Sequence, residues 1–315
     1  LGKIRISEGQ IPVGVFLEQL VNGLTIGSFY ALVALGYSMV YGVMKLINFA
    51  HGDLFALGSY VGYAVLVYGS CIITRTFGVW AGMAIAMACA FLLVGAAGLA
   101  MERIAYRPVT AAGRLPLVVS ALGVSIFLEN AIMAIWGPRY QAYPATVVPS
   151  VSWNIMGLRV TAMQSFILLF SLFLMAMLYY IVQKTRFGAA IRATALDREM
   201  ATMLGVDVDA VIRFIFFLGP ALGGIAGIMN GMYYRQISFA MGWNYGLKAF
   251  TATILGGIGN IPAAMVGGLL LGILEMLGAA YISSAWKDVF TFLVLILVLI
   301  VRPTGLVGER IAEKV

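Results

Sequence analysis

The feature that most constrains the fold is a series of apolar runs, most of about twenty residues, that recurs along almost the whole chain. A helix of about twenty residues can cross the hydrocarbon core of a bilayer, which is about 30 Å thick. The sequence therefore predicts an all-α integral membrane protein with about eight transmembrane helices and one short broken or re-entrant helix. The long runs lie at 16–43, 54–69, 77–101, 115–136, 163–183, 213–233, 263–283 and 288–301, and the short one lies at 249–258.

Composition supports a membrane protein, because 62% of the residues are hydrophobic and only 10% are charged. Ordinary soluble domains contain roughly 25% charged residues, so this chain needs the lipid bilayer as its partner. No linker or low-complexity segment separates independent units, and we expect one transmembrane domain over residues 1–315. The net charge of +7 is confined to a few loops without an extended basic arm, which argues against a nucleic-acid partner.

The basic residues indicate how the chain is oriented in the membrane. They concentrate in 102–114, in 184–213 and at the C-terminal end, at Arg302, Arg310 and Lys314. Loops rich in Lys and Arg stay on the cytoplasmic side, so we expect a multi-pass protein with its N-terminus outside and its C-terminus inside. Counting crossings from these loops requires the run 249–258 to enter the membrane and turn back near Gly256–Pro262.

Two polar, glycine-containing interruptions divide the runs, and each precedes a G-x-x-x-G sequence. The first contains Asn48, His51, Gly52 and Asp53 and is followed by Gly58 and Gly62; the second contains Gly257, Gly259, Asn260 and Pro262 and is followed by Gly268 and Gly272. This parallel suggests an internal repeat, and paired interruptions point to a translocation pathway. Two other interpretations stay open: G-x-x-x-G can simply bring helices close together, and the polar residues can simply satisfy the backbone of a helix break.

Two acids lie inside apolar runs, where an unpaired charge is costly. Glu275 could pair with a cation such as Lys248 or Arg235, and Glu129 lies beside Asn130. Pairing and a role in the translocation pathway are both open for Glu275. These acids also keep an ion-coupled secondary carrier as an alternative.

The sequence offers no catalytic or cofactor site. His51 is the only histidine, and Cys71 and Cys89 have no metal or redox spacing, so we expect no bound metal. No nucleophile elbow occurs that would indicate a membrane enzyme. A phosphate-binding G-x-x-x-x-G-K-[ST] loop is also absent. If transport uses ATP, the nucleotide and its Mg²⁺ must therefore bind to another subunit.

A partner ATPase would need a cytoplasmic attachment point, and the loop 184–213 contains one candidate. Residues 194–205 are expected to form one short helix with Thr194 as N-cap, Asp197 completing a capping box and Gly205 at the C-terminal cap. An apolar stripe would follow one face of it, formed by Leu196, Met200, Met203 and Leu204. The alternative is an amphipathic helix at the membrane surface without a partner.

This loop resembles the EAA loop of ABC importer permeases, whose pattern is E-A-A-x-x-x-G-x9-I-x-L-P. Glu199-Met200-Ala201 match its start, Gly205 has the right spacing, and Ile215 follows after nine residues. The chain departs from the pattern at Met200 and at Phe217-Leu218-Gly219-Pro220, where the Leu and Pro are separated.

Almost the whole chain resembles the branched-chain amino acid permease family, particularly its H-type subunit. The stretches that carry the resemblance are Asn22-Gly23-Leu24, Ala34-Leu35-Gly36, Ile47-Asn48-Phe49-Ala50-His51-Gly52-Asp53, Arg192-Ala193-Thr194-Ala195, Asp197-Arg198-Glu199, Gly246-Leu247-Lys248-Ala249-Phe250, Leu255-Gly256-Gly257 and Arg302-Pro303-Thr304-Gly305-Leu306.

The resemblance implies an ABC importer of the cytoplasmic membrane that carries branched-chain or other hydrophobic amino acids, with urea and short amides as alternative solutes. The implied partners are a second related permease, two ATP-binding cassette ATPases and an external solute-binding protein. ATPase coupling would then fall to Arg192, Thr194, Asp197, Arg198, Glu199, Ala201 and Gly205.

Overall fold

The protein is an all-α membrane bundle, which confirms the predicted fold class. The computed structural model describes residues 13–69, 73–149, 151–155, 158–302 and 304–306; Cys71, Pro303, Arg310 and Lys314 lie outside them. The helices are α1 (Val13–Met44), α2 (His51–Tyr63), α3 (Ile73–Met101), α4 (Arg114–Trp136), α5 (Ala162–Lys184), α6 (Arg186–Leu196), α7 (Arg198–Met203), α8 (Val208–Tyr234), α9 (Met241–Gly256), α10 (Ile261–Tyr281) and α11 (Lys287–Val301). Short π-helical segments follow α2 at Ala64–Tyr68 and α3 at Glu102–Tyr106, and 3-10 turns lie at Arg107–Ala112, Ala145–Val147 and Ser284–Trp286.

Among the described residues, seven helical segments are long and apolar enough to cross a membrane. They are Gly14–Met44, Gly78–Thr110, Leu115–Trp136, Ala162–Lys184, Val208–Tyr234, Ile261–Tyr281 and Ser284–Val301. The run predicted at 54–69 is α2 with its π-helical segment, which is not one of the seven and is largely buried inside the bundle. The short run predicted at 249–258 is the second half of α9, which begins earlier, at Met241.

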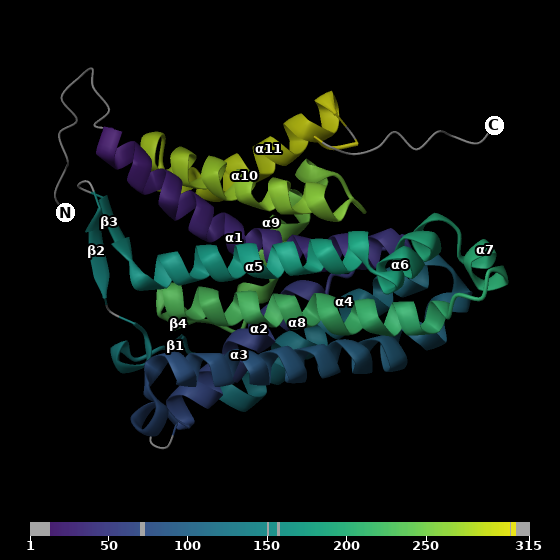
Figure 1. Ribbon diagram of the computed structural model, residues 1–315, viewed down its shortest axis with the longest axis horizontal. Coiled ribbons are helices and arrows are strands. Elements are labelled where there is room, and N and C mark those ends of the chain that lie inside the picture. The colour runs from purple at the N-terminus through teal and green to yellow at the C-terminus, as the bar shows by residue number, and fades with distance from the viewer. Residues whose placement is uncertain (1–12, 70–72, 150, 156–157, 303, 307–315) are drawn as a thin grey trace.

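Two antiparallel strand pairs lie at one end of the bundle. Strands β2 (Ser152–Ile155) and β3 (Leu158–Thr161) are antiparallel, with Ser152 opposite Thr161. Strands β1 (Gln141–Ala142) and β4 (Gln236–Ile237) form a second antiparallel pair. All four lie at the end opposite α6 and α7 (Figure 1).

The basic segments gather at the other end, as their predicted common cytoplasmic location requires. Arg107, from the segment after α3, forms an ion pair of 2.5 Å with Asp209 in the first turn of α8. Helices α6 and α7 project beyond the bundle at this end (Figure 1). We refer to it as the cytoplasmic end and to the strand-bearing end as the outer end.

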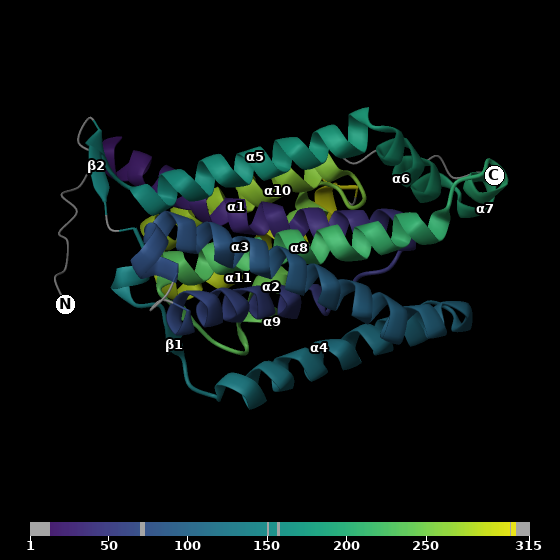
Figure 2. The same cartoon turned by 60° about the horizontal axis from the view of Figure 1, so that its bottom comes forward.

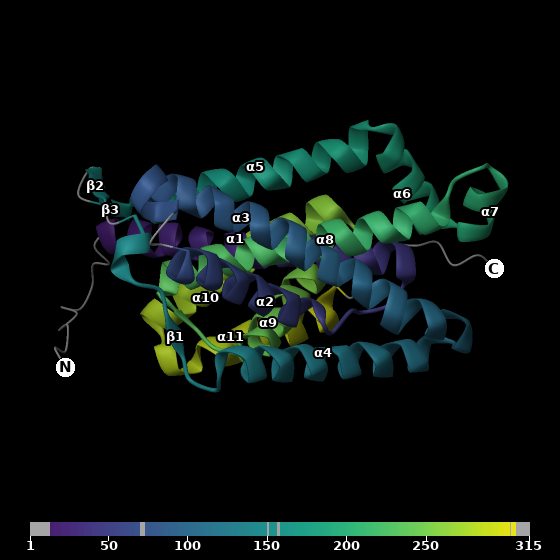
Figure 3. The same cartoon turned by 90° about the horizontal axis from the view of Figure 1, so that it is seen from below.

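The core is built around α1, α2 and α8, and the other helices surround it. Nearly all of α1 is buried, whereas α4 and α11 bury little of their surface. Figures 2 and 3 show α4 along one edge of the molecule, apart from the central helices. A largely exposed apolar helix at membrane depth contacts either lipid or another subunit.

Small residues let the central helices approach closely, which is what the G-x-x-x-G sequences predicted. A Cβ atom at Gly58 of α2 would lie 2.3 Å from the Cα of Gly224 in α8. A Cβ atom at Gly272 of α10 would lie 2.3 Å from the Cα of Gly27 in α1. Both G-x-x-x-G helices therefore pack on long central helices, one on α8 and the other on α1.

We expect Gly58→Ala to lower the free energy of unfolding by about 2 kcal/mol, because overpacking a tight contact typically costs about 1–3 kcal/mol. The added methyl group would meet the backbone of α8, which cannot rotate away. Gly123→Ala in α4 is the matched control, since nothing lies within 4 Å of a Cβ atom there. Denaturant titration in detergent micelles measures both, and equal effects would contradict the packing account.

Candidate functional site

The first interruption lies between α1 and α2, and the structure shifts its boundary. The irregular segment is 45–50, which begins with Lys45 in the left-handed region at φ 53°. His51, Gly52 and Asp53 were expected inside the break, but they form the first turn of α2. The His51 amide donates to the Asn48 carbonyl oxygen at 3.1 Å, which starts the helix immediately after the turn.

The imidazole of His51 fills a niche made by glycines of two other helices. A Cβ atom at Gly36 of α1 would lie 2.2 Å from its Nε2 atom, and Cβ atoms at Gly219 and Gly223 of α8 would lie 3.7 Å from the ring. Tyr37 packs edge-on against it, with ring centroids 4.8 Å apart. Gly36 is eight residues before the end of α1, so α2 starts about 12 Å inside that end. The segment 45–50 therefore folds back into the bundle.

The other residues of this break are also buried and tied to neighbouring helices. The Tyr106 hydroxyl donates to the Asn48 side-chain oxygen at 2.7 Å. The Ser125 hydroxyl of α4 donates to the carboxylate of Asp53, which is 2% exposed. A Cβ atom at Gly52 would lie 2.2 Å from the carbonyl oxygen of Gly242 in α9. The cavity beside this break measures about 10 Å³, room for at most about one water molecule.

The second interruption lies between α9 and α10, where the sequence predicted it. Gly257 and Gly259 have φ of +132° and +87°, values that L side chains rarely adopt. The Asn260 side chain caps α10 by accepting from the Ala263 amide at 3.2 Å, and Pro262 stands in the first turn, where its missing N–H is not needed.

This second break contacts the cytoplasmic end of α1 and the end of the described chain. A Cβ atom at Gly42 of α1 would lie 3.7 Å from the Gly259 carbonyl oxygen. The Leu306 amide donates to the Leu255 carbonyl oxygen at 2.9 Å, and a Cβ atom at Gly305 would lie 2.7 Å from the Cα of Gly257. Both breaks therefore lie against the same half of α1, one near Gly36 and the other near Gly42.

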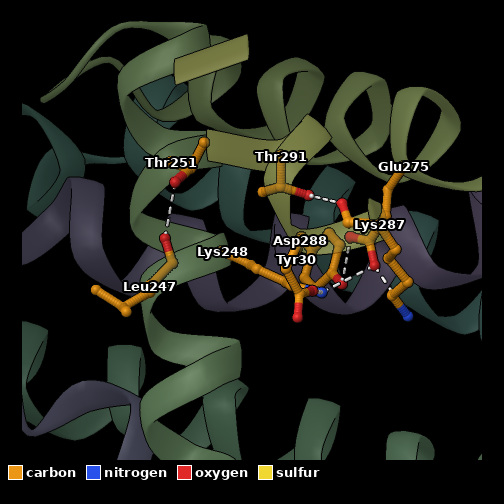
Figure 4. Close-up of polar contacts among 8 residues, drawn as sticks. All are labelled: Tyr30, Leu247, Lys248, Thr251, Glu275, Lys287, Asp288 and Thr291. Atoms are coloured by element: carbon orange, nitrogen blue, oxygen red, sulfur yellow. Dashed lines mark hydrogen bonds and ion pairs between the residues drawn. The ribbon is translucent and has the colours of Figure 1, made fainter. Parts of the chain in front are cut away.

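Glu275 lies apart from the two breaks, in a buried network of charges (Figure 4). Its carboxylate accepts from the Tyr30 hydroxyl at 2.7 Å and from Lys248 at 2.9 Å, and it pairs with Lys287 at 3.0 Å. Lys248 also reaches Asp288 at 2.7 Å. The expected pairing with Lys248 is confirmed, and Arg235 takes no part in it. The network joins α1, α9, α10 and α11.

Glu129, the other acid in an apolar run, does not pair with Asn130. The Asn130 amide instead donates to the Ile126 carbonyl oxygen at 2.7 Å, one turn back in α4.

The predicted single helix over residues 194–205 is wrong, because the chain breaks at Asp197. Asp197 has extended backbone angles, and its carboxylate accepts from the Glu199 and Met200 amides at 2.9 and 3.1 Å, so it is the N-cap of α7. Thr194 is not a cap; it is buried inside α6, and its hydroxyl donates to the Ala190 carbonyl oxygen. An aspartate binds two free amides at a helix start better than an upstream threonine can.

The predicted C-terminal cap is correct. Gly205 has φ +84°, its amide donates to the Thr202 carbonyl oxygen, and the Val206 amide donates to that of Ala201. These two bonds are the Schellman arrangement that favours glycine at this position. Ala201 is buried, whereas Glu199 and Gly205 are exposed.

Two arginines of this region donate hydrogen bonds to the ends of other helices. Arg192 donates to the Val182 carbonyl oxygen near the end of α5. Arg198 donates to the Val43 carbonyl oxygen from Nε at 3.0 Å and from Nη2 at 2.5 Å. Because the last carbonyls of a helix lack partners within it, Arg198 satisfies the end of α1. Burial lowers the pKa of Arg198, and burial together with the charge of Arg198 lowers the pKa of Lys45.

The four apolar residues predicted to form a stripe on one helix are exposed, but they lie on two helices, with Leu196 at the end of α6 and the others in or just after α7. Their side chains are 57–89% exposed: Leu196, Met200, Met203 and Leu204. Four large apolar side chains exposed this close together are unusual on a protein surface unless another molecule covers them. We refer to α6 and α7 with these four residues as the cytoplasmic knob.

The helices and their contacts do not by themselves identify a protein family. Comparison with known proteins does. The family model for the branched-chain amino acid transport system permease component matches residues 19–299. The chain belongs to this family. It is a multi-pass inner-membrane permease, a transporter subunit rather than an enzyme.

Two relatives match nearly the full length of this chain, and a third matches more than half of it. The chain is 43% identical to the high-affinity branched-chain amino acid transport system permease protein LivH of Escherichia coli, over 95% of this chain and 98% of that protein. It is 41% identical to the corresponding permease protein BraD of Pseudomonas aeruginosa over the same shares. The autoinducer 2 import system permease protein LsrC of Shigella flexneri is 28% identical over 59% of this chain and 55% of its own length.

The sequence alone did not identify the residues that bind Arg198, Asn48, Asp53 and His51. Val43 acts through a backbone carbonyl, which no residue type reveals. Tyr106 and Ser125 lie 58 and 72 residues from their partners. The glycines Gly36, Gly219 and Gly223 carried no local sign that they enclose His51.

Proposed function

We propose that this chain is a membrane-spanning subunit of an ABC importer for branched-chain or other hydrophobic amino acids. A second related permease completes the pathway, two ATPases bind the cytoplasmic ends, and an external binding protein delivers the solute. This chain binds no cofactor, and ATP with Mg²⁺ belongs to the ATPases. The names of the relatives with more than 40% identity support the solute class.

The observation that carries the proposal is the cytoplasmic knob. It presents four apolar side chains outward, while Arg198 binds its other side to the end of α1. A surface helix without a partner would be expected to turn such a stripe toward the bilayer or the bundle. The four side chains do not pack on the bundle, and their place at the end of a helix bound to α1 suits contact with a subunit that pushes on α7.

The contacts of α1 indicate how a push on α7 would reach the two breaks. A displacement of α7 would move the cytoplasmic end of α1 through Arg198. That end of α1 lies against Gly259 in the second break, and Gly36 higher up encloses His51 at the first. Both breaks interrupt regular helix, so they are where neighbouring helices can change angle. Alternating access then arises from rocking of the helices that flank them.

The double variant Met203→Glu/Leu204→Glu tests the attachment. Placing two carboxylates in an apolar contact should reduce the ATPase recovered with the tagged permease by about tenfold or more, since central apolar contacts dominate binding energies. Mass spectrometry of the complex, purified in mild detergent from native membranes, measures this.

The matched control is the double variant Val151→Glu/Trp153→Glu, which places two charges on exposed apolar residues at the outer end, outside the seven membrane-spanning segments. It should leave ATPase recovery unchanged. If the Met203→Glu/Leu204→Glu variant retains the ATPase while remaining in the membrane, the assignment of the cytoplasmic knob is wrong.

A further inference from the structure

A cavity of about 220 Å³ opens at the outer end of the bundle, away from both breaks and from the charged network around Glu275. It lies between the beginning of α1, strand β3 and the beginning of α5, which contact one another at that end (Figure 1). Its lining combines two charges of opposite sign, two amides and two small apolar side chains, namely Glu18, Arg159, Asn22, Gln164, Val21 and Val160.

The two charged residues are not satisfied by each other. Within the part of the chain that the structure describes, neither the Glu18 carboxylate nor the Arg159 guanidinium has a hydrogen-bond or ion-pair partner, although both line one cavity. An acid and an arginine that line one cavity without pairing can each bind one charged group of a zwitterionic ligand.

The amides give the cavity a fixed polar wall. Gln164 is 7% exposed, and its oxygen accepts from the Thr161 amide at 2.9 Å while its nitrogen donates to the Asn22 side-chain oxygen at 2.7 Å. The Asn22 side-chain nitrogen has no hydrogen-bond partner among the described residues and remains a free donor. Buried, hydrogen-bonded groups such as Gln164 hold their neighbours in one arrangement.

We propose that this outer cavity binds a zwitterionic α-amino acid with a small aliphatic side chain, as the first contact of the solute with the permease. Arg159 binds the α-carboxylate, since a guanidinium matches a carboxylate with two parallel bonds. Glu18 binds the α-ammonium group, and the free Asn22 donor adds a bond to the carboxylate. Val21 and Val160 contact the side chain.

The size of the cavity favours such a ligand. Pockets for drug-sized molecules measure roughly 300–1,000 Å³, so about 220 Å³ suits a smaller molecule. The cavity also lies at the end opposite the cytoplasmic knob, where a solute released outside the cell would arrive. This inference rests on the proposed function, because it names where an imported amino acid first binds.

Binding of radiolabelled leucine to the complete importer in nanodiscs, without the binding protein, tests the inference. Leucinol lacks the carboxylate, and 4-methylpentanoate lacks the ammonium group. We expect each to compete about tenfold more weakly than leucine, because each forfeits a charge-assisted bond. Equal competition by all three would overturn the inference, as would an importer that transports leucine but does not bind it here.

Two variants test which residue binds which charged group of the ligand. Arg159→Gln should abolish the preference for leucine over leucinol, and Glu18→Gln should abolish the preference over 4-methylpentanoate. Glu129→Gln, which removes an acid from α4, is the control and should change neither preference. Unchanged preferences in the first two variants would overturn the assignment.

The outcome separates the inference from the proposed function. If the wild-type complex shows no ATP-driven leucine uptake, the proposed function fails. If it imports leucine while the Glu18 and Arg159 variants bind and import it as the wild type does, only this cavity is excluded.

Discussion

Replacing Glu275 by leucine is expected to lower the free energy of unfolding by about 3 kcal/mol or more. Its side chain is fully buried and holds Tyr30, Lys248 and Lys287 together. Removing one partner of a buried ion pair leaves the others uncompensated and typically costs about 3–5 kcal/mol. Denaturant titration of the purified chain in detergent micelles measures the loss.

Asp288→Asn is the matched control, because it removes the other carboxylate of the same network. The Asp288 side chain is 68% exposed, and exposed ion pairs contribute only about 0–1 kcal/mol. A small loss for both variants would mean that Glu275 is not the centre of the network. A retained fold with lost transport in Glu275→Gln would instead place this acid in the translocation pathway.

Replacing Arg198 by glutamine is expected to separate ATP hydrolysis from transport. The variant loses the two bonds to the Val43 carbonyl oxygen, so displacement of α7 no longer moves α1. Transport per ATP hydrolysed should fall about tenfold or more, which corresponds to about 1.4 kcal/mol of lost coupling. The measurement is leucine uptake and phosphate release on the same proteoliposomes.

Arg186→Gln is the control for this variant, since it removes an exposed arginine of α6 that binds no other helix among the described residues. It should leave the ratio of uptake to hydrolysis unchanged. An unchanged ratio in Arg198→Gln would show that motion does not pass through α1. Loss of the ATPase from the complex would show instead that Arg198 serves attachment.

The sequence predicted the helices wherever the apolar pattern was uninterrupted, and it failed where polar residues are buried in pairs. The start of α9 was missed because Lys248 looks like a loop residue until Glu275 neutralises it. Likewise, His51 and Asp53 resembled a loop, yet glycines and Ser125 accommodate them at the start of α2. Such compensation comes from residues far away in the chain.

At the cytoplasmic knob, local signals were informative only in part. Gly205 was placed correctly because a left-handed cap depends on one residue. Asp197 and Thr194 are both good caps, but Thr194 lies inside α6, which begins at Arg186, so Asp197 begins the next helix. The inward direction of Arg198 depends on the position of α1, which no pattern in residues 184–213 encodes.

The most direct test of the central claim is uptake of radiolabelled leucine into proteoliposomes that contain this chain with its copurified partners. The binding protein is added outside the proteoliposomes, and ATP is supplied on the side of the ATPases. The account predicts that leucine accumulates, that accumulation stops without ATP, and that it continues when ion gradients are collapsed. Accumulation by this chain alone, driven by an ion gradient and independent of ATP, would contradict it and identify a secondary carrier.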